Sequence, residues 1–466
     1  MMNWLLRARM NSVGGVGLAV AGALLCALPA ARAQETAALG KDSSRSGHPK
    51  EPKERPLSDR LPDKPSLPPV FTFPVEPFGF SAPGPIYLGA RNSLVSLDFL
   101  DENRLLFTFR VPGLMHRDLG DSAGGEERQI RAVVVALPEG KIESEALWTV
   151  HDRLRYLWML KDGHFLLRDR DGLQQGDAKL ELKPLMQFPG PLLWLELDPT
   201  QQLMVTNSLE PALEKTNDAA DGQKTQPPSL TSGEQGKTHA GRDDSSRTEA
   251  RKTELVLRIL HRESGHVLLV SRVRSTVHLP INVDGYLESL RDNNEQWLLN
   301  LNYFGGGSRV LGRVESACSP ALEFVSQREV LVTGCTASGG RKLVAMDTGG
   351  HRLWEDSTSA SAIWPIVVMA PDGLRLAQET LAVTHPVNPF APFDSKDVKG
   401  QLVRVFDAAD GKVALEAPAS PALDSGGNVA ISPSGRRVAV LNAGAIQVFD
   451  LPAAPPLPDA GNQAGH

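Results

Sequence analysis

The stretch VAISPSGRRVAVLNAGAIQVFDL, residues 429 to 451, contains three short apolar runs separated by two turns. The first turn is Pro433-Ser434-Gly435, and the second extends from Asn442 to Gly444. Proline, serine, asparagine and glycine favour chain reversal, while runs of Val, Ile and Phe favour extended strands. The stretch therefore predicts a β-hairpin followed by a third strand.

The same pattern recurs six times before this stretch. Apolar runs paired around a short polar turn begin at Leu94, Arg155, Leu192, Gly285, Ala321 and Ile366. A second kind of turn, which contains glycine, follows later strands in VVVALPEGK, LRILHRESGH, VAMDTGGH and VRVFDAADGK. Units of strand, turn, strand and turn that repeat about every 40 residues are typical of propeller blades.

Residues 429 to 451 resemble a repeat of the WD40-like β-propeller superfamily. Blades of that superfamily contain an S-P-D-G-like turn, here Ser432 to Gly435, and a strand that ends in W-D or F-D, here Phe449-Asp450. The whole chain resembles exported bacterial propellers of unassigned function. This resemblance implies an all-β fold, a β-propeller with seven blades.

We expect a strand from the N-terminal side to close the ring. The last blade ends at AIQVFDL, and a proline-rich tail follows it, so the outer edge of this strand needs a neighbour. The first-choice donor is PIYLG, Pro85 to Gly89, and the second choice is VFTF from Val70.

The chain divides into one expected domain and several flanking segments. Residues 1 to 33 have the charged start, apolar core and Ala31-Arg32-Ala33 cleavage site of a secretory signal peptide, which predicts a periplasmic or secreted protein without a transmembrane span after cleavage. Residues 34 to 69 are rich in proline and charge and predict a disordered tether. A single propeller domain is expected over residues 70 to 452, with a disordered insertion at 211 to 252 and a loose tail at 453 to 466.

Two cysteines, Cys318 and Cys335, remain after signal cleavage and are disulfide candidates. They flank the predicted hairpin that begins at Ala321. A reversal centred between Ser326 and Gln327 sets Cys318 opposite Cys335 and Leu322 opposite Leu331. Opposed positions on neighbouring strands bring β-carbons within reach of a disulfide. Two buried thiols are the alternative.

The segment Gly120-Asp121-Ser122-Ala123-Gly124 matches the G-x-S-x-G pattern of serine hydrolases. That pattern needs a buried strand before the serine and a helix after it. Arg117 and Asp118 precede Ser122, and a strand pattern resumes soon after it, so we interpret the segment as the tip of a loop. The scattered histidines show no metal-binding spacing, although a propeller can gather ligands at its axis from several blades.

No catalytic, cofactor-binding or metal-binding residue is assigned, and no cofactor is expected. The leading hypothesis is a non-enzymatic binding or scaffolding propeller of the bacterial envelope, which uses one ring face for a protein or glycan partner. The alternative is an enzyme with its site in the central channel, such as a hydrolase or a metal-dependent lactonase. The net charge of -6 argues against a nucleic-acid partner, and we expect a monomer.

Overall fold

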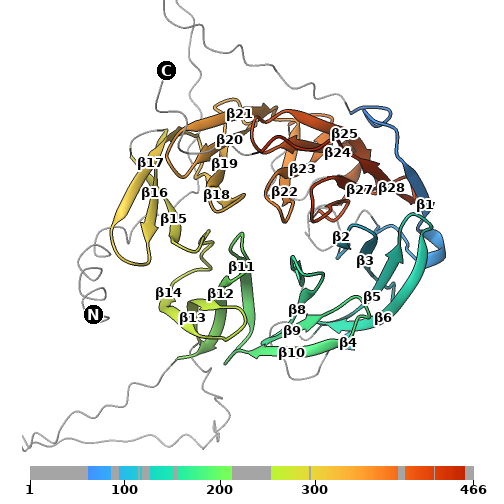
Figure 1. The fold of residues 1–466 in the computed structure, drawn as a ribbon, viewed down its shortest axis with the longest axis horizontal. Helices are drawn as coiled ribbons and strands as arrows, with labels where there is room; N and C mark the ends of the chain where they lie inside the picture. Colours follow the sequence, from blue (N-terminus) through green and yellow to red (C-terminus); the bar gives the residue numbers. More distant parts are fainter. Residues whose placement is uncertain are drawn as a thin grey trace, which may run out of the picture.

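The computed structural model describes residues 61–84, 94–113, 116–117, 126–151, 155–212, 253–292, 295–386, 394–423 and 426–456. These residues form seven antiparallel sheets around a common axis (Figure 1). The all-β fold and the seven-bladed propeller predicted from the sequence are confirmed. Each of the seven predicted hairpins supplies the two innermost strands of one blade.

The first three blades cover the N-terminal half of the ring. Blade 1 contains β2 (Ser96–Asp101), β3 (Arg104–Arg110), β5 (Glu126–Ala136) and β6 (Lys141–Val150), with the short β4 (His116–Arg117) also paired to β5. Blade 2 contains β7 (Leu157–Met159), β8 (Phe165–Asp169), β9 (Gly172–Gly176) and β10 (Leu182–Gln187). Blade 3 contains β11 (Leu192–Leu197), β12 (Leu203–Pro211), β13 (Thr253–His261) and β14 (Val267–Val273).

Blades 4 to 7 complete the ring. Blade 4 contains β15 (Gly285–Arg291), β16 (Gln296–Tyr303) and β17 (Ser308–Glu315). Blade 5 contains β18 (Ala321–Phe324), β19 (Glu329–Cys335), β20 (Arg341–Asp347) and β21 (Arg352–Thr358). Blade 6 contains β22 (Ala362–Met369), β23 (Arg375–Val383), β24 (Val398–Asp407) and β25 (Val413–Ala419), and blade 7 contains β26 (Val429–Ile431), β27 (Arg437–Asn442), β28 (Ala445–Asp450) and β1 (Phe71–Pro74). Two short 3-10 helices, η2 (Glu76–Phe78) and η4 (Ser395–Asp397), lie in connections.

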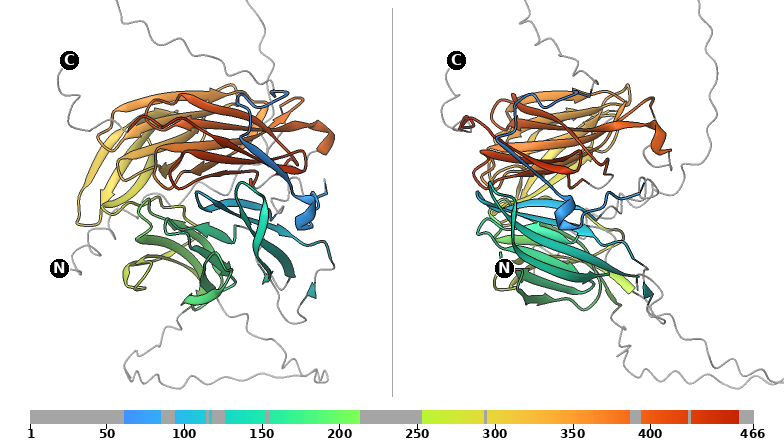
Figure 2. Two further views of the ribbon diagram at one scale, coloured as in Figure 1. Left: turned by 45° about the vertical axis from the view of Figure 1, so that its right-hand side comes forward. Right: turned by 90° about the vertical axis from the view of Figure 1, so that its right-hand side faces the viewer.

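The ring is closed by β1, which pairs antiparallel with β28 of the last blade (Figure 2). Phe71 lies opposite Val448, and Pro74 lies opposite Ala445. The prediction that an N-terminal strand closes the ring is confirmed, with the second-choice segment as donor. The first choice, Pro85 to Gly89, is wrong, because β1 already occupies the edge of β28; residues 85–89 themselves lie outside the described ranges.

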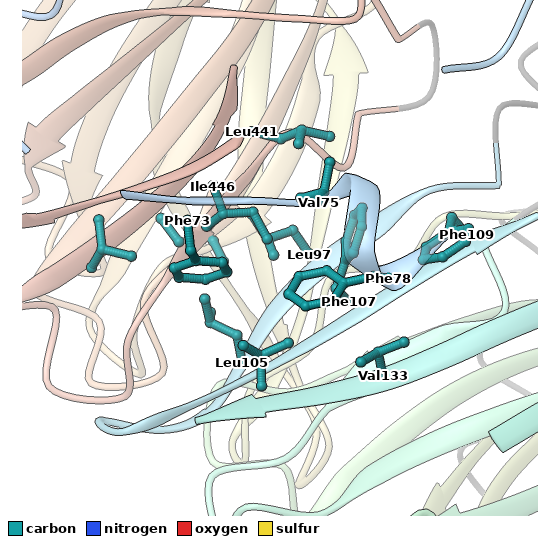
Figure 3. Close-up of a cluster of buried hydrophobic side chains, with 14 of the residues drawn as sticks. Phe73, Val75, Phe78, Leu97, Leu105, Phe107, Phe109, Val133, Leu441 and Ile446 are labelled. Carbon is teal, nitrogen blue, oxygen red and sulfur yellow. The ribbon is translucent and has the colours of Figure 1, made fainter. Parts of the chain in front are cut away.

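An apolar cluster joins the closing strand to the first and last blades (Figure 3). Phe73 of β1 and Phe78 of η2 have ring centroids 6.1 Å apart and pack with Phe107 of β3 and Ile446 of β28. Gly140 has a φ of +68°, and a Cβ there would lie 2.7 Å from the Phe73 side chain. Alternation of apolar and polar residues along β1 thus buries one face of the strand between blades 1 and 7.

Residues 66 and 67, at the end of the expected tether, contact the propeller. Ser66 donates its backbone N–H to the Glu416 carbonyl at 2.8 Å, and Leu67 packs against the core between blades 6 and 7. Leu67 supplies apolar area for this contact, so the last residues of the expected tether lie against the ring. Strands β12 and β13 flank the expected insertion, of which residues 213–252 lie outside the described ranges.

Cys318 and Cys335 form a disulfide in blade 5, across a sequence separation of 17 residues. The strand register used to pair them is wrong by one position: Leu322 lies opposite Val332 instead of Leu331. The two cysteines still meet because Cys318 precedes β18, where the regular ladder has ended. The Ala317 N–H bonds the Cys335 carbonyl at 3.0 Å and holds this segment beside the end of β19.

Among the described residues, no helix is long and apolar enough to cross a membrane.

Candidate functional site

Three acidic residues occupy the same position in alternate blades, on the innermost strand of each. They pair with the third residue of the next strand: Asp98 with Leu106 in blade 1, Glu196 with Val205 in blade 3, and Glu323 with Leu331 in blade 5. In the other four blades the same position holds Leu157, Leu290, Val368 and Ala430. Equivalent positions of a propeller lie at about the same height along its axis, so the three carboxyl groups are at one level of the ring.

Arg155, which precedes β7 of blade 2, adds a positive charge to this level. Its Nε donates to the Leu157 carbonyl at 3.0 Å, and its Cζ lies 5.4 Å from the centre of the Trp158 ring. Its guanidinium interacts electrostatically with all three acidic side chains. We call Asp98, Arg155, Glu196 and Glu323 the axial cluster.

The axial cluster spans the ring, since its members come from blades 1, 2, 3 and 5 (Figure 1). Glu196 and Glu323 repel one another although blade 4 lies between their blades in chain order. A hydrogen bond of 3.2 Å from Gln327 Nε2 to Asp198 Oδ2 ties the turns that follow their strands. The innermost strands of blades 3 and 5 are therefore held close together at this end of the axis.

Solvent reaches the axial cluster even though protein surrounds it. Arg155 and Glu323 are exposed, while Asp98 and Glu196 are half-buried. Neither terminal nitrogen of Arg155 has a hydrogen-bond partner in the described part of the chain, and no carboxyl of the cluster comes within ion-pair distance. The guanidinium and the carboxyl groups thus border a space that solvent enters.

Burial raises the pKa values of the acidic residues in the cluster. The pKa of Glu196 rises to about 7 because of burial and the nearby Glu323 charge. The protein that surrounds the axis also desolvates the carboxyl group of Glu323, although part of the side chain is exposed, and raises its pKa to about 7 against the opposing effect of Arg155. Burial likewise raises the pKa of Asp98. Arg155 stabilises both glutamates as anions, while the Glu323 charge opposes ionisation of Glu196, so the two carboxyl groups titrate as a coupled pair near pH 7.

A second buried acid, Glu379 of β23, belongs to a closed network between blades 6 and 7. Its carboxyl group accepts hydrogen bonds from Gln401 Nε2 at 3.0 Å and from the backbone N–H groups of Asn428 and Gly427 at 3.1 and 3.3 Å. Gln401 Oε1 in turn accepts a hydrogen bond of 2.6 Å from Asn428 Nδ2. Asn428 Oδ1 has no partner among the described residues, but the other hydrogen bonds of the network fasten the two blades together.

A third buried acid, Glu329, has no hydrogen-bond partner for either carboxyl oxygen among the described residues. It begins β19 and lies opposite Asp347. The equivalent pairs in blades 6 and 7 are Arg375 with Asp407 and Arg437 with Asp450. Blade 5 thus has a glutamate where blades 6 and 7 have an arginine, and burial raises the pKa of Glu329 from 4.5 to about 8.

We expect Glu329→Gln to stabilise the protein at high pH. Between about pH 4.5 and pH 8 the unfolded chain loses the proton that folded Glu329 keeps, so wild-type stability falls as the pH rises. The variant lacks this loss and should gain on the order of 2 kcal/mol at pH 8 and nothing at pH 4, as measured by urea denaturation at both values. The exposed Glu139→Gln is the control, and an equal gain for Glu329→Gln at both pH values would contradict the assignment.

The other residues noted in the sequence lie away from the axial cluster or outside the described ranges. Ser122 falls between β4 and β5, outside those ranges. Cys318 and Cys335 form the disulfide of blade 5. No group of three His, Cys, Asp or Glu side chains in the described residues is arranged to hold a metal ion. The sequence analysis missed all four members of the axial cluster.

Comparisons with known protein families and with curated protein sequences found no match. Several solved structures are similar at low identity. Acylaminoacyl peptidase of Pyrococcus horikoshii is 10% identical with a TM-score of 0.41, over 78% of this chain and 52% of that one. The β-propeller domain of the Trilobed protease from Pyrococcus furiosus is 10% identical, with a TM-score of 0.39, over 77% and 94%. A putative TolB from Agrobacterium tumefaciens is 12% identical, with a TM-score of 0.34, over 66% and 94%.

These comparisons correct the functional hypothesis drawn from the sequence. That hypothesis was a non-enzymatic binding or scaffolding propeller, with a channel-centred hydrolase or lactonase as the alternative. The solved structures that the chain resembles include peptidases, which contradicts the expectation of a non-enzymatic protein. The chain spans about half the length of those peptidases, and similarity at this level extends no further than the propeller arrangement, so it supplies no activity.

Proposed function

We propose that the protein acts through the axial cluster as a general acid–base site for a small polar molecule. The observation that carries this proposal is the convergence of three acidic side chains, at one register position in alternate blades, around an arginine that solvent reaches. Burying acids costs stability, and this arrangement is placed where a ligand could enter.

The two glutamates are suited to different roles. Acid–base catalysis is most effective when the pKa of the group lies near the working pH, and both groups have pKa values of about 7. Glu323, exposed and stabilised as an anion by Arg155, is the base. We assign Glu196, whose ionisation the Glu323 charge opposes, as the acid.

A generic probe tests the base directly. In 5-nitrobenzisoxazole, a carboxylate removes the ring C–H proton, the electron pair forms the nitrile, and the N–O bond breaks to release a coloured phenolate. We expect the chain without its signal peptide to open this ring at pH 8 about 100-fold faster than Glu323→Gln, with a rate that rises through pH 7. Glu196→Gln should retain activity and keep the midpoint of this pH profile near that of the wild type, because the proposed acid is neutral while Glu323 loses its proton.

The exposed Glu181→Gln, which changes a carboxyl group just before the outermost strand of blade 2, is the matched control and should behave as wild type. Equal rates for wild type and Glu323→Gln would exclude the proposed base. A wild-type rate without pH dependence would do the same.

A localisation outside the cytoplasmic membrane, in the periplasm or medium, remains part of this proposal. It is supported by the pattern of residues 1 to 33. Fractionation of cells that produce the full chain, followed by N-terminal sequencing, tests it: a mature protein that starts at Gln34 is expected outside the cytoplasm.

A further inference from the structure

Within the axial cluster, Arg155 has hydrogen-bond donors that no described residue accepts. An arginine has five N–H groups, and when buried or half-enclosed these are normally paired. Here Nε is bonded to the Leu157 carbonyl, and the terminal nitrogens have no partner among the described residues. The hydrogen bond to the Leu157 carbonyl and the contact with the Trp158 ring fix the plane of the guanidinium. The two terminal nitrogens are therefore oriented before any ligand binds.

Three acidic side chains surround the positively charged edge of Arg155. Asp98, Glu196 and Glu323 all interact with Arg155, but none forms a contact ion pair with it. A guanidinium surrounded by carboxyl groups would normally close onto one of them, because a bidentate pair is the strongest contact available to both. Because the guanidinium is not closed onto any of the three, its terminal edge is open to a molecule that bonds to it on one side and to the carboxyl groups on the other.

From this geometry we infer that the axial cluster binds a small zwitterion, which places its carboxylate on Arg155 and its ammonium group among Asp98, Glu196 and Glu323. A purely anionic ligand would meet the acidic side chains, and a purely cationic one would meet Arg155. Only a molecule with both groups satisfies both halves of the cluster. This inference rests on the proposed function in that it names the class of substrate for the same site.

The test uses three matched probes with the chain lacking its signal peptide: 6-aminohexanoate, hexanoate and hexylamine. Isothermal titration calorimetry at pH 7 should show 6-aminohexanoate binding at least tenfold more tightly than either singly charged probe. Arg155→Gln should abolish the advantage over hexylamine, and Glu323→Gln should reduce the advantage over hexanoate. Arg155→Lys, which keeps the charge without the planar fork, should lose part of the advantage and guards against a folding defect in Arg155→Gln.

Arg313→Gln is the control, because Arg313 is exposed on β17, the outermost strand of blade 4, and pairs with Asp292 instead of with a member of the axial cluster. Hexylamine binding as tightly as the zwitterion, an unchanged preference in Arg155→Gln, or no binding of any probe would overturn the inference. Base activity on the benzisoxazole without zwitterion binding would leave the acid–base site standing and remove this substrate class. Zwitterion binding without base activity would support the ligand class and remove the proposed acid–base role.

Discussion

Arg375→Met should destabilise the protein by about 3 to 5 kcal/mol. Arg375 is fully buried, and its Nε donates to Asp407 Oδ1 at 2.8 Å. Its terminal nitrogens donate to the Gly435 carbonyl at 2.8 Å and to the Pro452 carbonyl at 2.6 Å. The single side chain therefore connects blade 6 to the turn of blade 7 and to the segment after β28. Methionine fills similar space but leaves Asp407 charged and without its main partner in a buried setting.

Arg437→Met is the matched control, because Arg437 holds the equivalent position in blade 7 and bonds Asp450 at 2.8 Å. The Asp450 side chain is 50% exposed, so water replaces the lost partner and we expect a loss of at most about 1 kcal/mol. Equilibrium urea denaturation at pH 7 measures both free energies of unfolding. Losses of the same size for the two variants would show that burial does not control the strength of this repeated ion pair.

Phe73→Ala should also cost about 3 to 5 kcal/mol, and it should open the ring. Phe73 is 6% exposed and lies between blades 1 and 7, where it contacts the cluster shown in Figure 3. Its removal leaves a cavity at the one joint where strands from the two ends of the fold meet, since β1 and β28 are paired there. Other blades are closed by strands adjacent in sequence, so no second joint compensates.

Amide hydrogen exchange distinguishes ring opening from uniform loss of stability. In Phe73→Ala, the amides of β28 that pair with β1 should lose protection before those of the central blades. Thr72→Ala changes an exposed side chain on the same strand and should shift the free energy of unfolding by less than about 0.5 kcal/mol. Protection lost equally in all blades of Phe73→Ala would contradict a special role for this joint.

Local patterns in the sequence were sufficient to predict the blades. Each hairpin is specified by apolar runs and by a turn whose residues favour reversal, and these effects operate over a few positions. The turn Pro433-Ser434-Gly435 illustrates this, since Gly435 adopts a φ of +67° in the reversal between β26 and β27. The closing strand was expected on the N-terminal side for a different reason, the exposed outer edge of the last strand, and the second-choice segment supplies it.

A signal for the axial cluster was present in the sequence but was not recognised. The three acidic residues each lie between apolar neighbours in the first strand of a hairpin, as Leu97-Asp98-Phe99, Leu195-Glu196-Leu197 and Leu322-Glu323-Phe324. An acid at an interior position of a short apolar strand is unfavourable unless it faces solvent or a partner. Alignment of the hairpins at their turns would have placed the three acids at one level.

The sequence by itself determined the strands, their turns and the number of blades, because these depend on steric preferences and alternation within about 20 residues. The tertiary structure decided the features that depend on distant segments. The strand register in blade 5 differed by one position from the symmetric hairpin, since several registers have similar local energies and packing selects among them. The axial cluster forms only when the ring is closed, because its residues span positions 98 to 323 and converge through the packing of whole blades around a common axis.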